Sequence, residues 1–127
     1  MSWRGELMIH TAHASGCHWL TAGTGLHHQR GEWLIVRVYT ALRVAEAALR
    51  HANCCMELTR QHSDLMHDFD WAYAYEGVAR AHAVAGNRDE ALRHIELAQK
   101  AGEAIKEEEN RRIFVADFNG GNWNQMR

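Results

Sequence analysis

The sequence predicts an all-α fold, and three observations lead to it. Apolar residues recur at helical spacing along nearly the whole chain. No alternating, β-branched run of useful strand length competes with that pattern. The 127 residues contain no proline, which would break or kink a helix. Glycine-containing or polar breaks divide the chain into about five or six helices, which we expect to form an antiparallel helix-turn-helix array.

The first three helices are separated by a glycine break and a short turn. The first helix is expected over about residues 2–21, and the Gly23-Thr24-Gly25 break ends it. The second is expected over about residues 26–42. The third covers about residues 45–61 and ends in a polar stretch.

The later helices have clearer end signals. A fourth helix over about residues 69–85 begins behind two aspartates, whose negative charge suits the positive end of a helix dipole, and Gly86 ends it. The fifth begins with Asn87 and a glutamate three residues on, which resembles a capping box, and continues to about residue 105. A last short helix opens with the glutamates 107–109 and closes before Gly120.

The length corresponds to one domain, because independent domains cluster around 100 to 150 residues. We expect a single helical domain over residues 1–121 and a flexible tail over residues 122–127, in which Trp123 is either docked or exposed.

Composition and charge exclude several classes of protein. The apolar share of 46% and the charged share of 24% are typical of globular proteins, and no apolar run is long enough to cross a membrane. A net charge of −2 argues against nucleic acid as a partner, because phosphate binding needs a clustered positive face. Three cysteines, two of them adjacent, do not form a disulfide framework, and the N-terminus has no apolar signal segment. These features predict a cytoplasmic protein.

Residues 75–98 match the helix-turn-helix spacing of one repeat family. Small residues at fixed positions let two antiparallel helices approach, and large ones on the facing helix fill the gap. The matching positions are Tyr75, Val78, Ala79, His82, Gly86, Ala91, Ile95 and Ala98. On these residues the chain resembles the tetratricopeptide repeat, with His82 in place of a tyrosine and without the closing proline.

A weaker copy of the repeat lies upstream. Its second helix has Ala48, Ala52 and Cys55 at the small-large-small positions, whereas Glu32 and Arg43 depart from the pattern. The two copies are offset by more than the usual period of about 34 residues. Together they cover about residues 26–105, and the chain resembles small bacterial tetratricopeptide-repeat proteins.

The resemblance implies a stack of helices whose first helices line a groove for a protein or peptide partner, without catalysis. The residues that it places along this groove are Arg30, Trp33, Arg37, Tyr73, Glu76 and Arg80. Guanidinium groups beside aromatic rings suit carboxylate recognition combined with stacking. The alternative is that these arginines are solvated beside a core tryptophan.

Two repeats form a short stack with unprotected ends, so the outer helices must cap it or a second copy must cover it. The uneven charge along the chain is compatible with a homodimer, since residues 63–110 carry an acidic excess and the flanking regions a basic one.

A second hypothesis concerns metal binding by the first helix. His10, His13 and Cys17 lie on one helical stripe with Glu6, and all are residue types that bind zinc. Glu6 and Cys17 are about 16 Å apart along a helix, so one ion cannot reach all four. A site built on this stripe would take zinc or another transition metal, with a further ligand from elsewhere; otherwise no cofactor is expected. The alternative is that these histidines form hydrogen bonds across helix interfaces.

A nucleophilic enzyme is the third class considered. His51 and Cys55 are four residues apart on one helix, within possible contact. Cys55, however, falls on a small buried position of the weaker repeat, where a cysteine acts as a compact hydrophobic residue. The sequence therefore predicts a protein that is not an enzyme.

Overall fold

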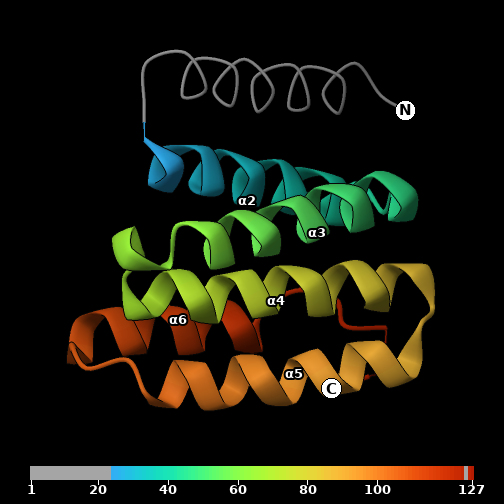
Figure 1. The fold of residues 1–127 in the computed structure, drawn as a ribbon. Coiled ribbons are helices and arrows are strands. Elements are labelled where there is room, and N and C mark those ends of the chain that lie inside the picture. Colours follow the sequence, from blue (N-terminus) through green and yellow to red (C-terminus); the bar gives the residue numbers. More distant parts are fainter. Residues whose placement is uncertain (1–23, 125) are drawn as a thin grey trace.

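The computed structural model describes residues 24–124 and 126–127, and these form an all-helical array, which confirms the predicted fold class (Figure 1). The helices of the described residues are α2 (Gly25–Ala41), α3 (Ala45–Gln61), α4 (Asp68–Ala85), α5 (Arg88–Glu103) and α6 (Glu108–Asn119), with a 3₁₀ turn at Ser63–Leu65. The helix expected over about residues 2–21 lies outside the described residues. Among the helices described, none is both long and apolar enough to cross a membrane.

The ends of two helices follow from their local sequence. Thr24 caps α2, since its hydroxyl accepts from the His27 amide at 3.4 Å and its own amide donates to the His27 ring at 3.3 Å. Gly86 ends α4 in the left-handed region, with φ of 80°, where a residue without Cβ is favoured.

The capping box expected at the start of α5 is absent. The Asn87 side chain makes no capping bond to α5. Its carboxamide lies instead 3.1 Å from Nδ1 of His82, on the preceding helix. A tertiary contact with α4 has therefore replaced the local capping bond.

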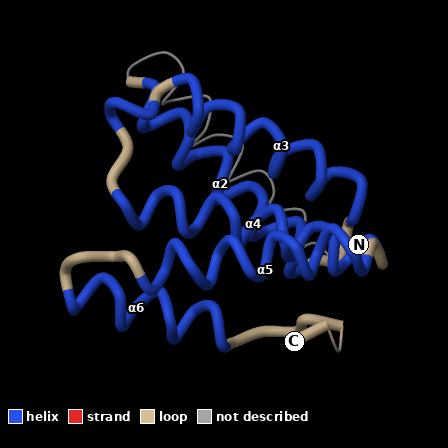
Figure 2. Tube along the Cα trace, turned by 60° about the horizontal axis from the view of Figure 1, so that its bottom comes forward, coloured by secondary structure: helices blue, strands red, loops and turns tan. Residues whose placement is uncertain are grey.

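Consecutive helices pack as antiparallel hairpins, α2 with α3 and α4 with α5, and α3 packs on α4 (Figure 1). The first helices of the two hairpins, α2 and α4, also touch each other. Helix α6 lies against α4 and α5, and the C-terminal segment continues from it along the same side of the molecule (Figure 2).

Helix α4 contributes to the core on both of its sides. Its small residues allow the neighbouring helices to approach closely, and alanines 72, 74, 79, 81 and 83 are at most 1% exposed. One cluster joins Ala74 and Val78 to Val36 and Met56 of the first hairpin. The other joins Ala79 to α5, α6 and Trp123. The position of α4 between these clusters determines which of its side chains remain for a binding face.

Of the two alternatives for Trp123, the structure shows the docked one. The indole is 6% exposed, and its Nε1 donates to the Phe118 carbonyl at 3.0 Å. The next residue, Asn124, donates to the Ala83 carbonyl at 2.6 Å and accepts from Arg43 at 2.7 Å. The expectation of a flexible tail over residues 122–127 is therefore wrong at Trp123 and Asn124. These two residues are docked, because the indole fills the core beside α6.

Candidate functional site

The six residues expected along the groove lie on α2 and α4, and the structure places them around two pockets. Trp33 of α2 and Tyr73 of α4 meet edge to face, with ring centroids 5.2 Å apart. The first pocket, which we call the charged pocket, is lined by Arg37, Glu76 and Arg80, one or two helical turns further along α2 and α4. The second, which we call the aromatic pocket, is lined by Arg30, Trp33 and Tyr73.

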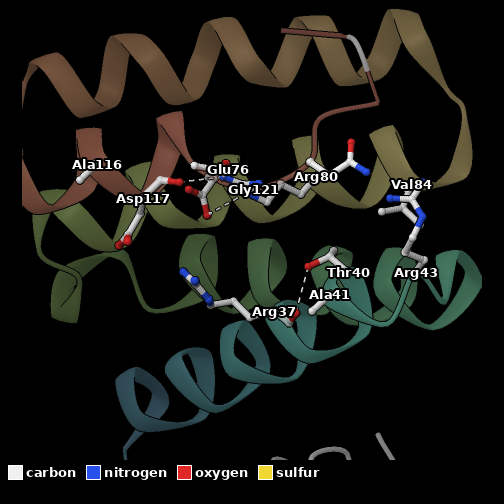
Figure 3. Close-up of a pocket in the computed structure, with 12 residues that line it drawn as sticks. Arg37, Thr40, Ala41, Arg43, Glu76, Arg80, Val84, Ala116, Asp117 and Gly121 are labelled. Carbon is white, nitrogen blue, oxygen red and sulfur yellow. Dashed lines mark hydrogen bonds and ion pairs between the residues drawn. The ribbon is translucent and has the colours of Figure 1, made fainter. Parts of the chain in front are cut away.

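The charged pocket has a volume of about 460 Å³. Figure 3 shows its side chains converging on the space between α2 and α6, with α4 behind that space. Its walls come from α2, α4 and α6, from the turn after α2 and from the segment after α6. The lining residues that carry polar or charged side chains are Arg37, Thr40, Arg43, Glu76, Arg80, Asp117 and Asn122. Residues of α6 and beyond therefore complete a site that the repeat pattern had placed on α2 and α4 alone.

Arg80 holds the wall of the charged pocket in place. Its Nη2 donates to the carbonyls of Asp117 at 2.8 Å and Gly120 at 2.9 Å. Its guanidinium carbon lies 4.1 Å from the centre of the Trp123 ring, and its Nε lies 3.7 Å from Oε1 of Glu76. These contacts use most of the guanidinium, so the main role of Arg80 is to fasten the C-terminal segment to α4.

Glu76 is a buried carboxyl group at the base of the charged pocket. It is 1% exposed, and its Oε2 has no hydrogen-bond partner among the described residues. Burial raises the pKa of Glu76, while Arg80 and Arg37 act in the opposite direction. The carboxyl group therefore takes up a proton more readily than an exposed glutamate does.

Arg37 is the groove arginine whose charge is left for a ligand. Its guanidinium lies 5.1 Å from the centre of the Trp33 ring, and it makes no hydrogen bond or ion pair with the residues described. Arg30, by contrast, holds both carboxylate oxygens of Asp70, at 3.0 and 3.1 Å. With Arg80 bound to carbonyls, Arg37 is thus the one of the three groove arginines whose charge, within the described part of the chain, is left to bind an anion.

The aromatic pocket has a volume of about 400 Å³. Trp33, Leu34, Phe69 and Tyr73 give it mostly apolar walls. Two buried polar atoms in these lining residues, Nε1 of Trp33 and Oε1 of Gln29, have no hydrogen-bond partner within the described part of the chain. Apolar walls with a few polar atoms are typical of a ligand pocket.

Tyr73 connects the two pockets. Its hydroxyl donates to Oδ2 of Asp117 at 2.5 Å, and its ring packs edge to face on Phe114 with centroids 4.9 Å apart. Burial and the bond to Asp117 both raise the pKa of Tyr73, so it remains a neutral hydrogen-bond donor. Tyr73 therefore fixes α6 against α4 at the boundary between the pockets.

Asp117 is the functional candidate that the sequence analysis missed. Its position on the pocket wall depends on how α6 packs against α4, just as the pairing of Arg30 with Asp70 depends on how closely α2 approaches α4.

The remaining candidates do not form a site within the described residues. The stripe with His10, His13 and Cys17 lies outside them. Cys55 is 2% exposed, its thiol donates to the Gln29 carbonyl at 3.5 Å, and burial raises its pKa. His51 instead lies 2.6 Å from Oε2 of Glu32. The expectation that Cys55 is a core residue is confirmed.

Comparison of the chain with protein-family models, with curated proteins and with solved structures gives no significant match.

Proposed function

We propose that this chain is a non-catalytic binding module that holds a peptide or a segment of a partner protein across α2, α4 and α6. The observation that carries the proposal is the pair of neighbouring pockets, one aromatic and one charged, on the face where the first helices of the two hairpins meet. Two consecutive hairpins with touching first helices also support a tetratricopeptide-like arrangement.

The chemistry of the two pockets defines the ligand. The aromatic pocket suits an apolar side chain, because its walls are mostly apolar. Arg37, one helical turn from Trp33, suits a carboxylate. We therefore expect a segment in which an acidic side chain or a free C-terminus lies close to an apolar residue.

Selection of peptides from a random displayed library, followed by calorimetric titration of those selected, tests this function. We expect enrichment of peptides that combine an apolar residue with a carboxylate. The variant Arg37→Glu should bind them at least about tenfold more weakly, because it replaces the free cation by a like charge.

The matched control is Arg50→Glu, which makes the same charge change at an exposed position of α3. Trp33→Phe keeps an aromatic ring but reduces the apolar wall of the aromatic pocket, and it should weaken binding without changing the preference for a carboxylate. If the selected peptides bind the Arg37 and Arg50 variants equally well, the groove is not their binding site.

A further inference from the structure

Three side chains that bind metals lie together away from the groove, at the end where α4 and α5 are joined. His82 is on the last turn of α4, and Glu90 and His94 are one turn apart near the start of α5. Gly86 and Asn87 form the turn between the helices, at the right of Figure 1. One donor atom from each of the three side chains lies within 4.8 Å of the other two.

We propose that His82, Glu90 and His94 bind a divalent transition-metal ion, with zinc as the first candidate. Two imidazoles and one carboxylate are a common protein ligand set for zinc, with metal–ligand bonds of about 2.0 to 2.2 Å. Such bonds place neighbouring donors roughly 3.4 Å apart in a tetrahedral site. The three donors lie within 4.8 Å of one another and would move closer by side-chain rotation on binding, with the largest movement made by Glu90, whose side chain is 48% exposed.

The outer contacts of both histidines favour metal binding. Nδ1 of His94 lies 2.9 Å from the Glu90 carbonyl, to which it donates when it carries the proton. This bond leaves the lone pair on Nε2, and such a contact to a backbone carbonyl is usual for a metal-bound histidine. Nδ1 of His82 lies 3.1 Å from the carboxamide of Asn87. A half-turn of that carboxamide presents its oxygen, which accepts the Nδ1 proton when Nε2 binds the ion.

Among the charges around the cluster, the Arg93 guanidinium is the cation that an ion must displace from Glu90. His94 is 8% exposed and its ring stacks on that of His82, with centroids 5.8 Å apart. Glu90 is held by Arg93 at 2.9 Å, but both partners are exposed and a pair of this kind contributes little stability.

Because of the position of the cluster, binding of an ion would have two consequences. Because the ligands come from both helices of one hairpin, the ion would join α4 to α5 and stabilise the folded chain. Three protein ligands also leave one coordination position for water or for a side chain of a partner.

The test is a titration of the full chain, free of any affinity tag and stripped with a chelator, with zinc in competition with a chromophoric indicator. We expect one ion per chain and a rise in Tm with excess zinc. Glu90→Gln and His94→Gln should each weaken zinc binding at least about tenfold, and Asn87→Ala by a similar factor through the outer contact. Glu90→Gln is informative even if His94→Gln folds poorly, because Glu90 is exposed.

The matched control is the double variant His10→Gln and His13→Gln, which removes two imidazoles of the N-terminal stripe. It should bind zinc as the unmodified chain does. The proposal is overturned if this control loses the ion, if the Glu90 and His94 variants keep full affinity, or if the unmodified chain binds no stoichiometric zinc.

Discussion

The guanidinium of Arg80 stacks on the ring of Trp123, 4.1 Å from its centre, and this contact joins the middle of the chain to its C-terminus. The same guanidinium donates to carbonyls at the end of α6 and lies beside Glu76. An arginine that the sequence placed on the groove as a ligand-binding cation is thus a structural clamp, and the charged pocket depends on it for its shape.

Arg80→Met should therefore destabilise the fold. The substitution keeps an apolar stem but removes the hydrogen bonds to the α6 carbonyls and leaves Glu76 without its cation. We expect the free energy of unfolding, measured by urea denaturation, to fall by about 2 to 4 kcal/mol. Arg37→Met should change it by less than about 1 kcal/mol, because Arg37 is exposed and its guanidinium lies over the Trp33 ring without a hydrogen bond or ion pair to any described residue. Equal effects of the two substitutions would contradict the assignment of Arg80 as the clamp.

The stability of the chain should depend on the charge of Glu76. Because burial raises the pKa of Glu76 in the folded state, the folded chain holds this proton more tightly than the unfolded chain. The contribution of Glu76 to stability is therefore full below the ordinary glutamate pKa and is lost as the pH rises through the folded-state value. Glu76→Gln removes this dependence, so the variant should gain stability relative to the unmodified chain as the pH rises from 4 towards 8.

Denaturation curves across this pH range measure the effect. Glu96→Gln serves as the control, because Glu96 is exposed and paired with Lys100 on the surface. If the Glu76 variant instead lost stability relative to the unmodified chain as the pH rises, Arg80 and Arg37, and not burial, would dominate the ionisation.

Two helical glycines should respond in opposite directions to the same substitution. A Cβ on Gly102 would lie 2.4 Å from Cε2 of Phe114, whose ring is 1% exposed and cannot move aside. A Cβ on Gly77 would lie 3.5 Å from Cγ1 of Val36, an ordinary contact. Thermal unfolding should show Gly102→Ala less stable by about 1 to 3 kcal/mol and Gly77→Ala more stable by about 0.5 to 1 kcal/mol. A stabilised Gly102 variant would mean that α5 and α6 do not pack this closely.

Removal of the Trp123 side chain should show how much the C-terminal segment contributes. Trp123→Ala is expected to lower the free energy of unfolding by about 3 to 5 kcal/mol, because it empties a site in the core. Trp123→Phe keeps an aromatic ring and loses the bond to the Phe118 carbonyl, so its cost should be nearer 1 kcal/mol. Leu92→Ala, at an exposed position of α5, is the control and should have little effect. If Trp123→Ala were as mild as this control, the tail would not be docked in solution.

The helices were predictable because their signals are local. Apolar spacing placed all five helices of the described residues within a few residues of their observed bounds, and Gly86 ends α4 as expected, since a left-handed turn favours glycine. The capping box at Asn87 was wrong for the opposite reason. The Asn87 side chain can bond either to a local backbone amide or to the ring of His82 on α4. The distance between Asn87 and His82 cannot be read from the sequence.

The candidate site was predictable only in part. Repeat spacing placed Arg37 and Trp33 on one face with Tyr73, because residues at that spacing share a helical stripe. It did not show that Arg30 is held by Asp70, that Arg80 is held by α6, or that Arg37 alone of the three arginines is left for a ligand. The cluster of His82 with Glu90 and His94 was missed as well, since its ligands lie on two helices and match no short metal-binding pattern.

The sequence by itself determined that the described part of this protein is a helical array and about where its helices begin and end, because both follow from the 3.6-residue period and the residues that end a helix. The tertiary structure decided which charged groups are paired and which remain for a ligand. That decision depends on distances of a few ångströms between helices, set by the alanines of α4 and by the rings of Phe114 and Trp123 packed beside it. Arg37 and Arg80 are the same residue type, and the packing around each leaves the charge of Arg37 unpaired among the described residues and holds that of Arg80 in contacts within the fold.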